Sequence, residues 1–126
     1  MTTTTVLPAA SGKGRLITIW ILSGLLTVAF LAAGVSKLAG ATAMVELFDK
    51  VGLGQWFRYV TGLLEVVGAI GLLISRYAFY AAVLLVIVMI GAIIAHVTVL
   101  GSSPAAPLVL LVLTGIIAYL RKPAKD

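Results

Sequence analysis

Three ionisable residues of this sequence, Lys37, Glu65 and His96, lie where the surrounding residues are almost entirely apolar. A charged side chain in hydrocarbon is costly, and such residues usually face a protein interior or a cavity. A carboxylate placed near an amine and an imidazole can accept, hold and return protons. We therefore predict a buried polar site suited to acid–base chemistry, with Glu65, His96 and Lys37 as its candidate catalytic residues.

Small residues surround Glu65 at helical spacing. Thr61 and Gly62 precede it by four and three positions, and Gly68 and Ala69 follow it by three and four. Small residues let helices approach closely in membranes, so Glu65 is expected to face the interior of a helix bundle. The side chains expected to line a ligand site near it are Thr61, Phe30, Trp56, Arg58 and Ala92.

Structural roles are open for the same residues. Lys37 could extend its amine to the lipid headgroups, and His96 could hydrogen-bond a neighbouring helix. Glu65 could be one half of a structural ion pair, with either Lys37 or Arg58 as its partner. Trp56 has the position of an aromatic anchor at the membrane interface.

Composition places the chain in a membrane. Of its 126 residues, 62% are hydrophobic and 10% are charged, and the mean hydropathy is +1.21. A soluble domain is usually about 45–50% apolar and could not bury this excess at such a length. The net charge is +5, but the basic residues flank apolar stretches instead of clustering on one face, which excludes nucleic acid as a partner.

Cysteine is absent from the sequence. Disulfide chemistry, iron–sulfur clusters and thiolate metal sites are therefore excluded for this chain. Glu65 and His96 together fall short of the usual number of metal ligands, so no metal site is predicted.

The apolar pattern predicts an all-α fold, an integral membrane four-helix bundle. A helix needs roughly 20 apolar residues to span the hydrocarbon core, and the sequence offers spans at about 16–37, 59–75, 79–100 and 105–120. Between the first two, residues 42–51 place apolar side chains at i, i+3, i+4 and i+7, which predicts a short amphipathic helix in the membrane interface. These apolar residues are Met44, Leu47, Phe48 and Val51.

Four spans place both termini on one side of the membrane. That side carries Lys13, Arg15, Arg76, Arg121, Lys122 and Lys125, and the other carries Lys37, Lys50 and Arg58. The positive-inside rule then predicts a multi-pass protein of the cell membrane with cytoplasmic termini. Residues 1–15 are predicted to be a disordered cytoplasmic tail, and 121–126 a basic one. A signal peptide is the alternative for the N-terminus, but the first apolar stretch is longer than usual for one.

Three stretches resemble the DoxX-like family of small four-helix integral membrane proteins. They are FLAAGVSKLAG at 30–40, TGLLEVVGAIGLLI at 61–74 and VIVMIGAIIAHV at 86–97, and their order and spacing carry the resemblance. It implies that Lys37 and Glu65 are the buried polar pair of the family. It also implies a role like that of members that pass electrons to quinone, including those of sulfur-compound oxidation, or that of accessory and assembly proteins.

Three functions follow as hypotheses. The first is a membrane component of a quinone-linked oxidoreductase system, with quinone as its cofactor, no covalently bound group, and a redox or other membrane-protein partner. The second is a cofactor-free membrane enzyme performing epoxide opening, isomerisation or cyclisation on a lipid-soluble substrate. The third is an assembly or chaperone partner of another membrane protein. A homodimer through a Gly91/Ala95 face is a further expectation.

Overall fold

The computed structural model describes residues 3–123, with side chains from residue 12 onward. In that part of the chain the fold is all-α, as predicted, and no strand is present. The elements in order are α1 (Thr3–Ala39), α2 (Thr42–Val51), α3 (Gln55–Leu72), α4 (Ala78–Ala95), a π-helical turn η1 (His96–Leu100) and α5 (Ala105–Arg121).

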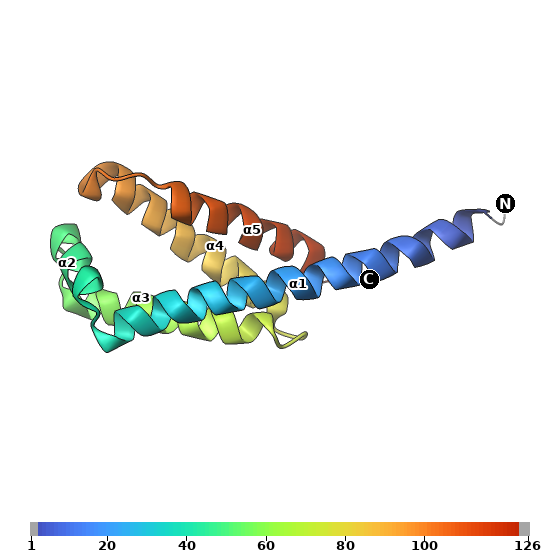
Figure 1. The fold of residues 1–126 in the computed structure, drawn as a ribbon, viewed down its shortest axis with the longest axis horizontal. Helices are drawn as coiled ribbons and strands as arrows, with labels where there is room; N and C mark the ends of the chain where they lie inside the picture. The colour runs from blue at the N-terminus through green and yellow to red at the C-terminus, as the bar shows by residue number, and fades with distance from the viewer. Residues whose placement is uncertain (1–2, 124–126) are drawn as a thin grey trace.

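The four long helices form two antiparallel pairs. Helix α1 packs along α3, α4 packs along α5, and α3 also contacts α4. Figure 1 shows the pairs converging toward the loop between α3 and α4 and diverging toward the end at which α2 lies. We call these the loop end and the α2 end. At the α2 end, α2 contacts both α3 and η1, so it bridges the two pairs.

Glycine allows α1 and α3 to touch through their backbones. A Cβ atom on Gly34 would lie 2.8 Å from the carbonyl oxygen of Gly62, and one on Gly62 would lie 2.9 Å from that of Gly34. Nearer the loop end, the Thr27 hydroxyl donates a hydrogen bond of 3.0 Å to the Ala69 carbonyl oxygen. The small residues predicted around Glu65 thus bring the two helices together.

Replacing Gly62 by alanine is expected to destabilise the bundle by about 1–3 kcal/mol, because the added methyl group overlaps the α1 backbone. Gly24→Ala is the matched control, since an added Cβ there meets no atom within 4 Å. Thermal unfolding in detergent, followed by circular dichroism, measures both. Equal stability of the two variants would mean that α1 and α3 do not need this close approach.

The bundle has an apolar core and an apolar outer surface. The core contains Leu26, Phe30, Ala69, Leu72, Ala81, Ala82, Leu85, Met89 and Ile117. On the outside, large apolar side chains are more than half exposed, among them Leu25, Val28, Ile87, Ile94 and Val112. Soluble monomers rarely expose contiguous apolar surface on this scale, so this surface suits lipid.

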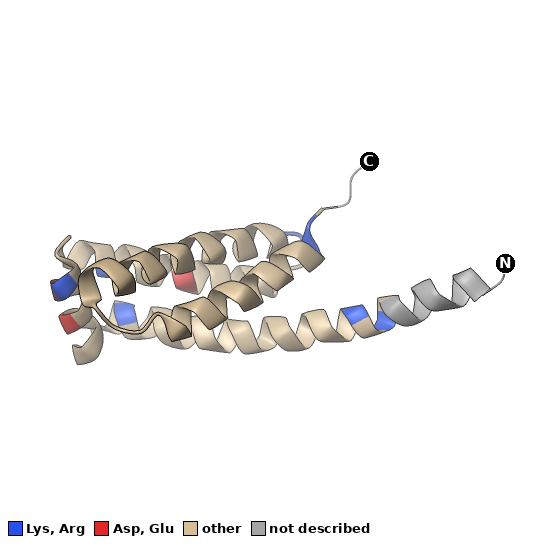
Figure 2. Ribbon diagram, turned by 90° about the horizontal axis from the view of Figure 1, so that it is seen from above, with Lys and Arg blue, Asp and Glu red and all other residues tan. Residues whose placement is uncertain are grey.

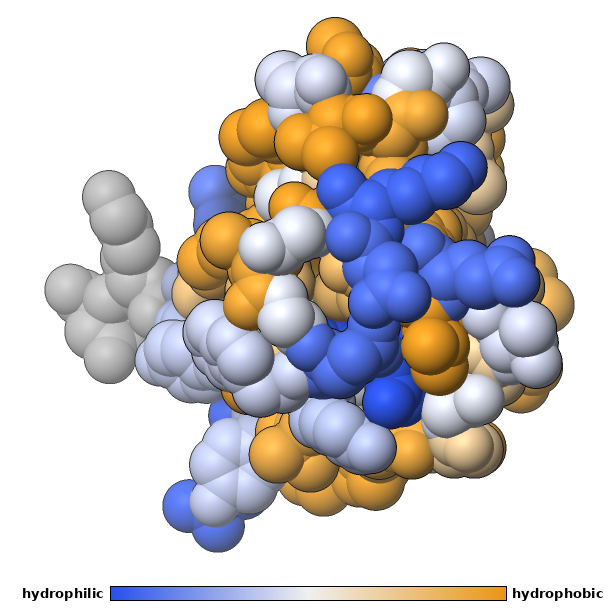
Figure 3. Space-filling model, turned by 90° about the vertical axis from the view of Figure 1, so that its left-hand side faces the viewer, coloured by the Kyte–Doolittle hydropathy of each residue, from blue (hydrophilic) through white to orange (hydrophobic). Residues whose placement is uncertain are grey.

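Charged residues occupy the two ends of the bundle. At the loop end, Arg15 donates a hydrogen bond of 2.9 Å to the Leu120 carbonyl, and Arg121 donates one of 3.4 Å to the Ser75 carbonyl. Figure 2 shows basic residues at this end and at the α2 end. Seen from the α2 end, hydrophilic residues form a band between hydrophobic ones (Figure 3). The described members of the larger set predicted to be cytoplasmic therefore lie toward the loop end, and Lys125 lies outside the described residues.

Two stretches, Gly12–Ala39 and Ala78–Leu100, are long and apolar enough to cross a membrane, and Ala105–Arg121 is a shorter apolar helix. Helix α1 begins at Thr3, where the composition predicts a disordered tail, because an existing helix extends at little cost. Residues 1–2 and 124–126 of the predicted tails lie outside the described residues. The side of the membrane on which the tails lie stays a prediction.

Candidate functional site

A cavity of about 500 Å³ lies between the two helix pairs at the α2 end. Its walls come from all five α-helices and η1, and they are mostly apolar. Four of its lining residues, Met44, Leu47, Phe48 and Val51, are the apolar stripe of α2. Small-molecule sites in proteins usually measure roughly 300–1,000 Å³ and combine apolar walls with a few polar groups. The cavity has the size and the walls of such a site.

The three candidate catalytic residues all line this cavity. Lys37 comes from the C-terminal part of α1, Glu65 from the middle of α3, and His96 from the start of η1. Their convergence follows from the antiparallel packing, because the α2 end combines the end of α1, the first half of α3 and the end of α4. Lys37, Glu65 and His96, although far apart in the sequence, therefore lie at the same level of the bundle.

Lys37 and Glu65 form a buried ion pair. Lys37 Nζ lies 2.9 Å from Glu65 Oε1, and the side chains are 13% and 3% exposed. Glu65 Oε1 is fully buried, and Lys37 is the cation in contact with it. The carboxylate is therefore held mainly by the charge of Lys37.

Arg58 hydrogen-bonds the C-terminal end of α1 and does not pair with Glu65. Its Nε donates a hydrogen bond of 2.6 Å to Gln55 Oε1, and its Nη1 donates one to the Lys37 carbonyl oxygen. The last carbonyls of a helix lack partners within the helix, and Arg58 satisfies one of them. Arg58 is 5% exposed and does not line the cavity. Of the two ion-pair partners that the sequence offers Glu65, the structure uses Lys37.

Gln55 holds helix α2 in place over the α2 end of the bundle. Its amide nitrogen donates hydrogen bonds of 3.0 Å to the Val45 carbonyl and 2.8 Å to Asp49 Oδ1. The turns on either side of α2 use Gly40 and Gly52, whose φ angles are 75° and 82°. Only glycine adopts such angles readily. These turns direct the apolar stripe of α2 into the cavity.

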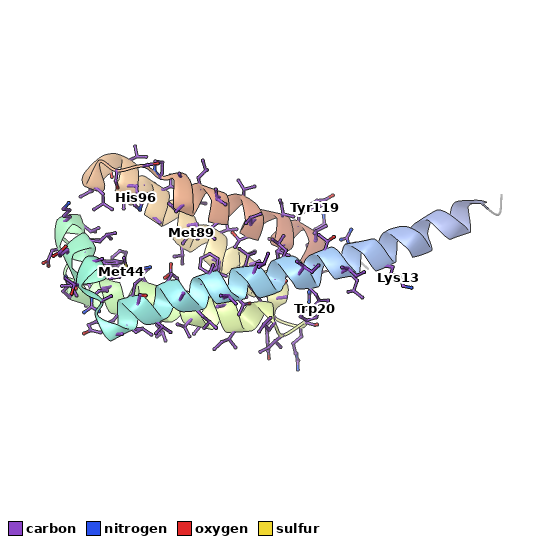
Figure 4. The ribbon with its side chains drawn as sticks, in the orientation of Figure 1. Lys13, Trp20, Met44, Met89, His96 and Tyr119 are labelled. Carbon is purple, nitrogen blue, oxygen red and sulfur yellow. The ribbon has the colours of Figure 1, made fainter. Side chains whose placement is uncertain are left out.

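His96 is held by Ser102, because its Nδ1 lies 2.7 Å from the Ser102 hydroxyl oxygen. The Ser102 backbone N–H also donates a hydrogen bond of 3.2 Å to the His96 carbonyl. The imidazole therefore has a fixed orientation, and its Nε2 has no hydrogen-bond partner within the described residues. Figure 4 labels His96 and Met89 beside Met44, and all three line the cavity. The sequence predicts a continuous helix here and gives no signal for the π-helical turn, a feature that often occurs at functional sites.

The predicted ligand-lining residues divide into two groups. Thr61 and Ala92 line the cavity, and the Thr61 hydroxyl donates a 2.8 Å hydrogen bond to the Phe57 carbonyl. Phe30, Trp56 and Arg58 do not line it. Phe30 shares a face with Lys37 but fills the core below the cavity, and Trp56 is 61% exposed on the outside.

Among the lining residues that sequence reasoning missed, those of α2 had the clearest signal. Their i, i+3, i+4, i+7 spacing is a clear signal of an apolar face, which we assigned to the membrane interface. The structure turns this face inward onto the cavity. Among residues 3–123, no three His, Cys, Asp or Glu side chains gather closely enough to hold a metal ion.

The helical fold, the apolar outer surface and the buried ion pair beside an apolar cavity define a small helical membrane protein. The chain belongs to the DoxX-like family, whose sequence pattern matches residues 21–117, so the predicted resemblance is confirmed. It is also similar to YdgD of Bacillus subtilis (strain 168), described as an uncharacterized protein, with 39% identity over 75 residues. That match covers 56% of this chain and 66% of the relative, just under two thirds. No solved structure matches this chain.

Proposed function

We propose that this chain is a four-span protein of the cell membrane and the membrane component of a quinone-linked oxidoreductase system. In this role the cavity binds the quinone headgroup. The observation that supports the proposal is that one apolar cavity presents the amine of Lys37, the carboxylate of Glu65 and the imidazole of His96. These groups are the donors and proton carriers that a headgroup with two carbonyl oxygens requires.

Helices α1, α3, α4 and α5 are the four spans in this proposal, and η1 extends α4. Helices α3 and α5 have 18 and 17 residues, so each is about 26 Å long. A hydrocarbon core of about 30 Å can thin or draw in flanking residues to accommodate such a length. The basic loop end lies in the cytoplasm by the positive-inside rule, and the cavity therefore belongs to the outer half of the bilayer.

The cavity fits a quinone in both shape and chemistry. Apolar walls suit the ring, while Lys37 Nζ and His96 Nε2 can donate hydrogen bonds to its carbonyl oxygens. A bound quinone would supply a two-electron, two-proton redox step, with the electrons delivered by a redox partner protein. Glu65 holds or returns a proton at its carboxylate, His96 does so at Nε2, and α2 excludes water.

A second candidate function is supported by the placement of acid and base groups on two walls. The Lys37–Glu65 pair lies on the α1–α3 pair of helices, and His96 lies beyond the end of α4. A substrate between them would meet a general acid on one side and a general base on the other. This arrangement suits cofactor-free epoxide opening, isomerisation or cyclisation of a lipid-soluble substrate.

The experiment is mass spectrometry of lipid extracts from protein purified in mild detergent. Wild type is compared with Glu65→Gln and with Glu46→Gln, a matched change at an exposed carboxylate of α2. One quinone species should be enriched with wild type and Glu46→Gln. It should be about tenfold lower with Glu65→Gln, because the change removes the charge that holds the Lys37 amine in place to donate a charge-assisted hydrogen bond to the headgroup.

Each other result favours a different function. Enrichment of a lipid that is not a quinone, with the same dependence on Glu65, favours the cofactor-free enzyme. Bulk phospholipid alone in three folded proteins contradicts the quinone proposal. A role as an assembly partner of another membrane protein would then be the remaining hypothesis.

A further inference from the structure

A second hollow, of about 430 Å³, lies between α3 and α4 on the side facing the loop end. Its lining is almost entirely apolar and includes Val67 from α3, Leu84 from α4, and Ile74 and Tyr77 from the loop between the two helices. No residue lines both hollows. The residues that line the two hollows nevertheless follow one another along α3 and along α4.

On α3, one stripe of residues runs from the cavity into the second hollow. Val60 and Leu64 line the cavity, and Val67 and Gly71 line the second hollow. Their spacings of i, i+4, i+7 and i+11 place all four on one face of the helix. The stripe is therefore continuous between the two hollows.

A matching stripe runs along α4 in the opposite direction. Leu84 lines the second hollow, and Gly91, one heptad later, lines the cavity. A Cβ atom on Gly68 would lie 2.7 Å from the Leu85 side chain, so the two stripes run beside each other. We call this track the α3–α4 seam. Its length on α3, from Val60 to Gly71, is about 17 Å at 1.5 Å per residue.

The α3–α4 seam is open to the outside along its length. Val60, Val67 and Ile87 border it and are 41%, 52% and 60% exposed. A Cβ atom added to Gly91 would meet no atom within 4 Å. The cavity thus opens sideways onto the apolar exterior of the bundle, which in the proposed function is lipid.

We infer that the ligand is an amphiphile with one long apolar tail, whose head occupies the cavity and whose tail lies along the α3–α4 seam toward Tyr77. The position of the head rests on the proposed function. The tail specifies the class of ligand. It is a long-tailed lipid and not a short molecule that the cavity could enclose by itself. Apolar contacts along about 17 Å of seam then contribute to its affinity.

The seam is shallow where it passes the second hollow. A Cβ atom on Gly71 would lie 2.8 Å from the Ala81 Cβ, so α3 and α4 nearly touch beneath the second hollow. A helix with its side chains is roughly 10 Å wide. A single hydrocarbon chain is much thinner and fits such a shallow track.

The inference is tested by titrating two probes into the detergent-solubilised protein: a benzoquinone with a decyl tail, and the same headgroup without the tail. Val67→Trp fills the seam without touching the cavity. Val35→Trp is its matched control, because Val35 on α1 is 53% exposed against 52% for Val67 and lines neither hollow. Calorimetry gives the affinities, and size-exclusion chromatography gives the oligomeric state.

Val67→Trp should weaken the tailed probe about tenfold, the effect of losing roughly two buried methylene groups, and leave the headgroup probe unchanged. Val35→Trp should change neither. Equal affinities of the tailed probe for wild type and Val67→Trp would overturn the inference. A changed oligomeric state of Val67→Trp alone would also overturn it, by making the seam a protein interface.

Failure of the proposed function gives a different result. If wild type binds neither quinone, the headgroup assignment fails. The lipids that copurify with wild type and the two tryptophan variants then show whether a tail occupies the seam. A single-tailed lipid lost from Val67→Trp alone would uphold the seam with another headgroup. Equal retention by all three proteins, or no enriched lipid in wild type, would overturn the seam as well.

Discussion

Replacing Lys37 by methionine is expected to destabilise the protein by about 3–5 kcal/mol, because the change leaves a buried charge without its partner. The Glu65 side chain is 3% exposed, and Lys37 Nζ at 2.9 Å is the cation in contact with it. Methionine keeps most of the length of the lysine stem, so lost packing adds little. Thermal unfolding in detergent, followed by circular dichroism, measures the loss.

Two controls separate the ion pair from other effects of Lys37→Met. Combining it with Glu65→Gln removes both charges, and most of the stability should return, as is often found when a buried pair is replaced as a whole. Lys50→Met removes an exposed lysine from α2 and should leave unfolding unchanged. If Lys37→Met alone unfolds like wild type, the pair does not hold the bundle together.

Replacing Ala92 by tryptophan is expected to abolish ligand binding, with a loss of affinity of at least about a hundredfold, or roughly 2.7 kcal/mol. Ala92 lines the cavity from α4, and an indole ring there would occupy space that the headgroup needs. The measurement is titration with the tail-free quinone, which depends on the cavity alone.

Ile90→Trp controls for the bulk of a tryptophan on α4. Ile90 is 45% exposed and lines neither the cavity nor the second hollow, so its replacement should leave the affinity unchanged. Unfolding curves confirm that both variants fold. Wild-type affinity in folded Ala92→Trp would mean that the ligand lies elsewhere in the protein.

The arrangement of α2 gives the cavity its chemical character. Without α2, the end between the diverging helix pairs would be open to water, and Lys37 and Glu65 would interact through a high dielectric. Gln55 and the glycine turns hold α2 in place, and Phe48 meets Phe57 edge to face at 5.9 Å. A site closed to water strengthens the interaction between charges and between charges and ligand.

The sequence by itself determined the membrane character, the helical fold and the burial of one carboxylate, Glu65. These follow from local properties: the length of apolar stretches, the 3.6-residue period of α2, and the cost of a charge such as Glu65 in hydrocarbon. The antiparallel order of the helices was also sufficient to predict that Lys37, Glu65 and His96 share one level of the bundle.

Only the tertiary structure decided how these residues are used. The divergence of the two helix pairs creates the cavity, and the glycine turns fold α2 over it, so a stripe expected to face the interface faces inward. Packing places Phe30 in the core. Arg58 hydrogen-bonds the end of α1, so Lys37 is the cation that pairs with Glu65. Residue types and spacing do not specify helix crossing angles or loop directions, and the partners of the polar groups depend on both.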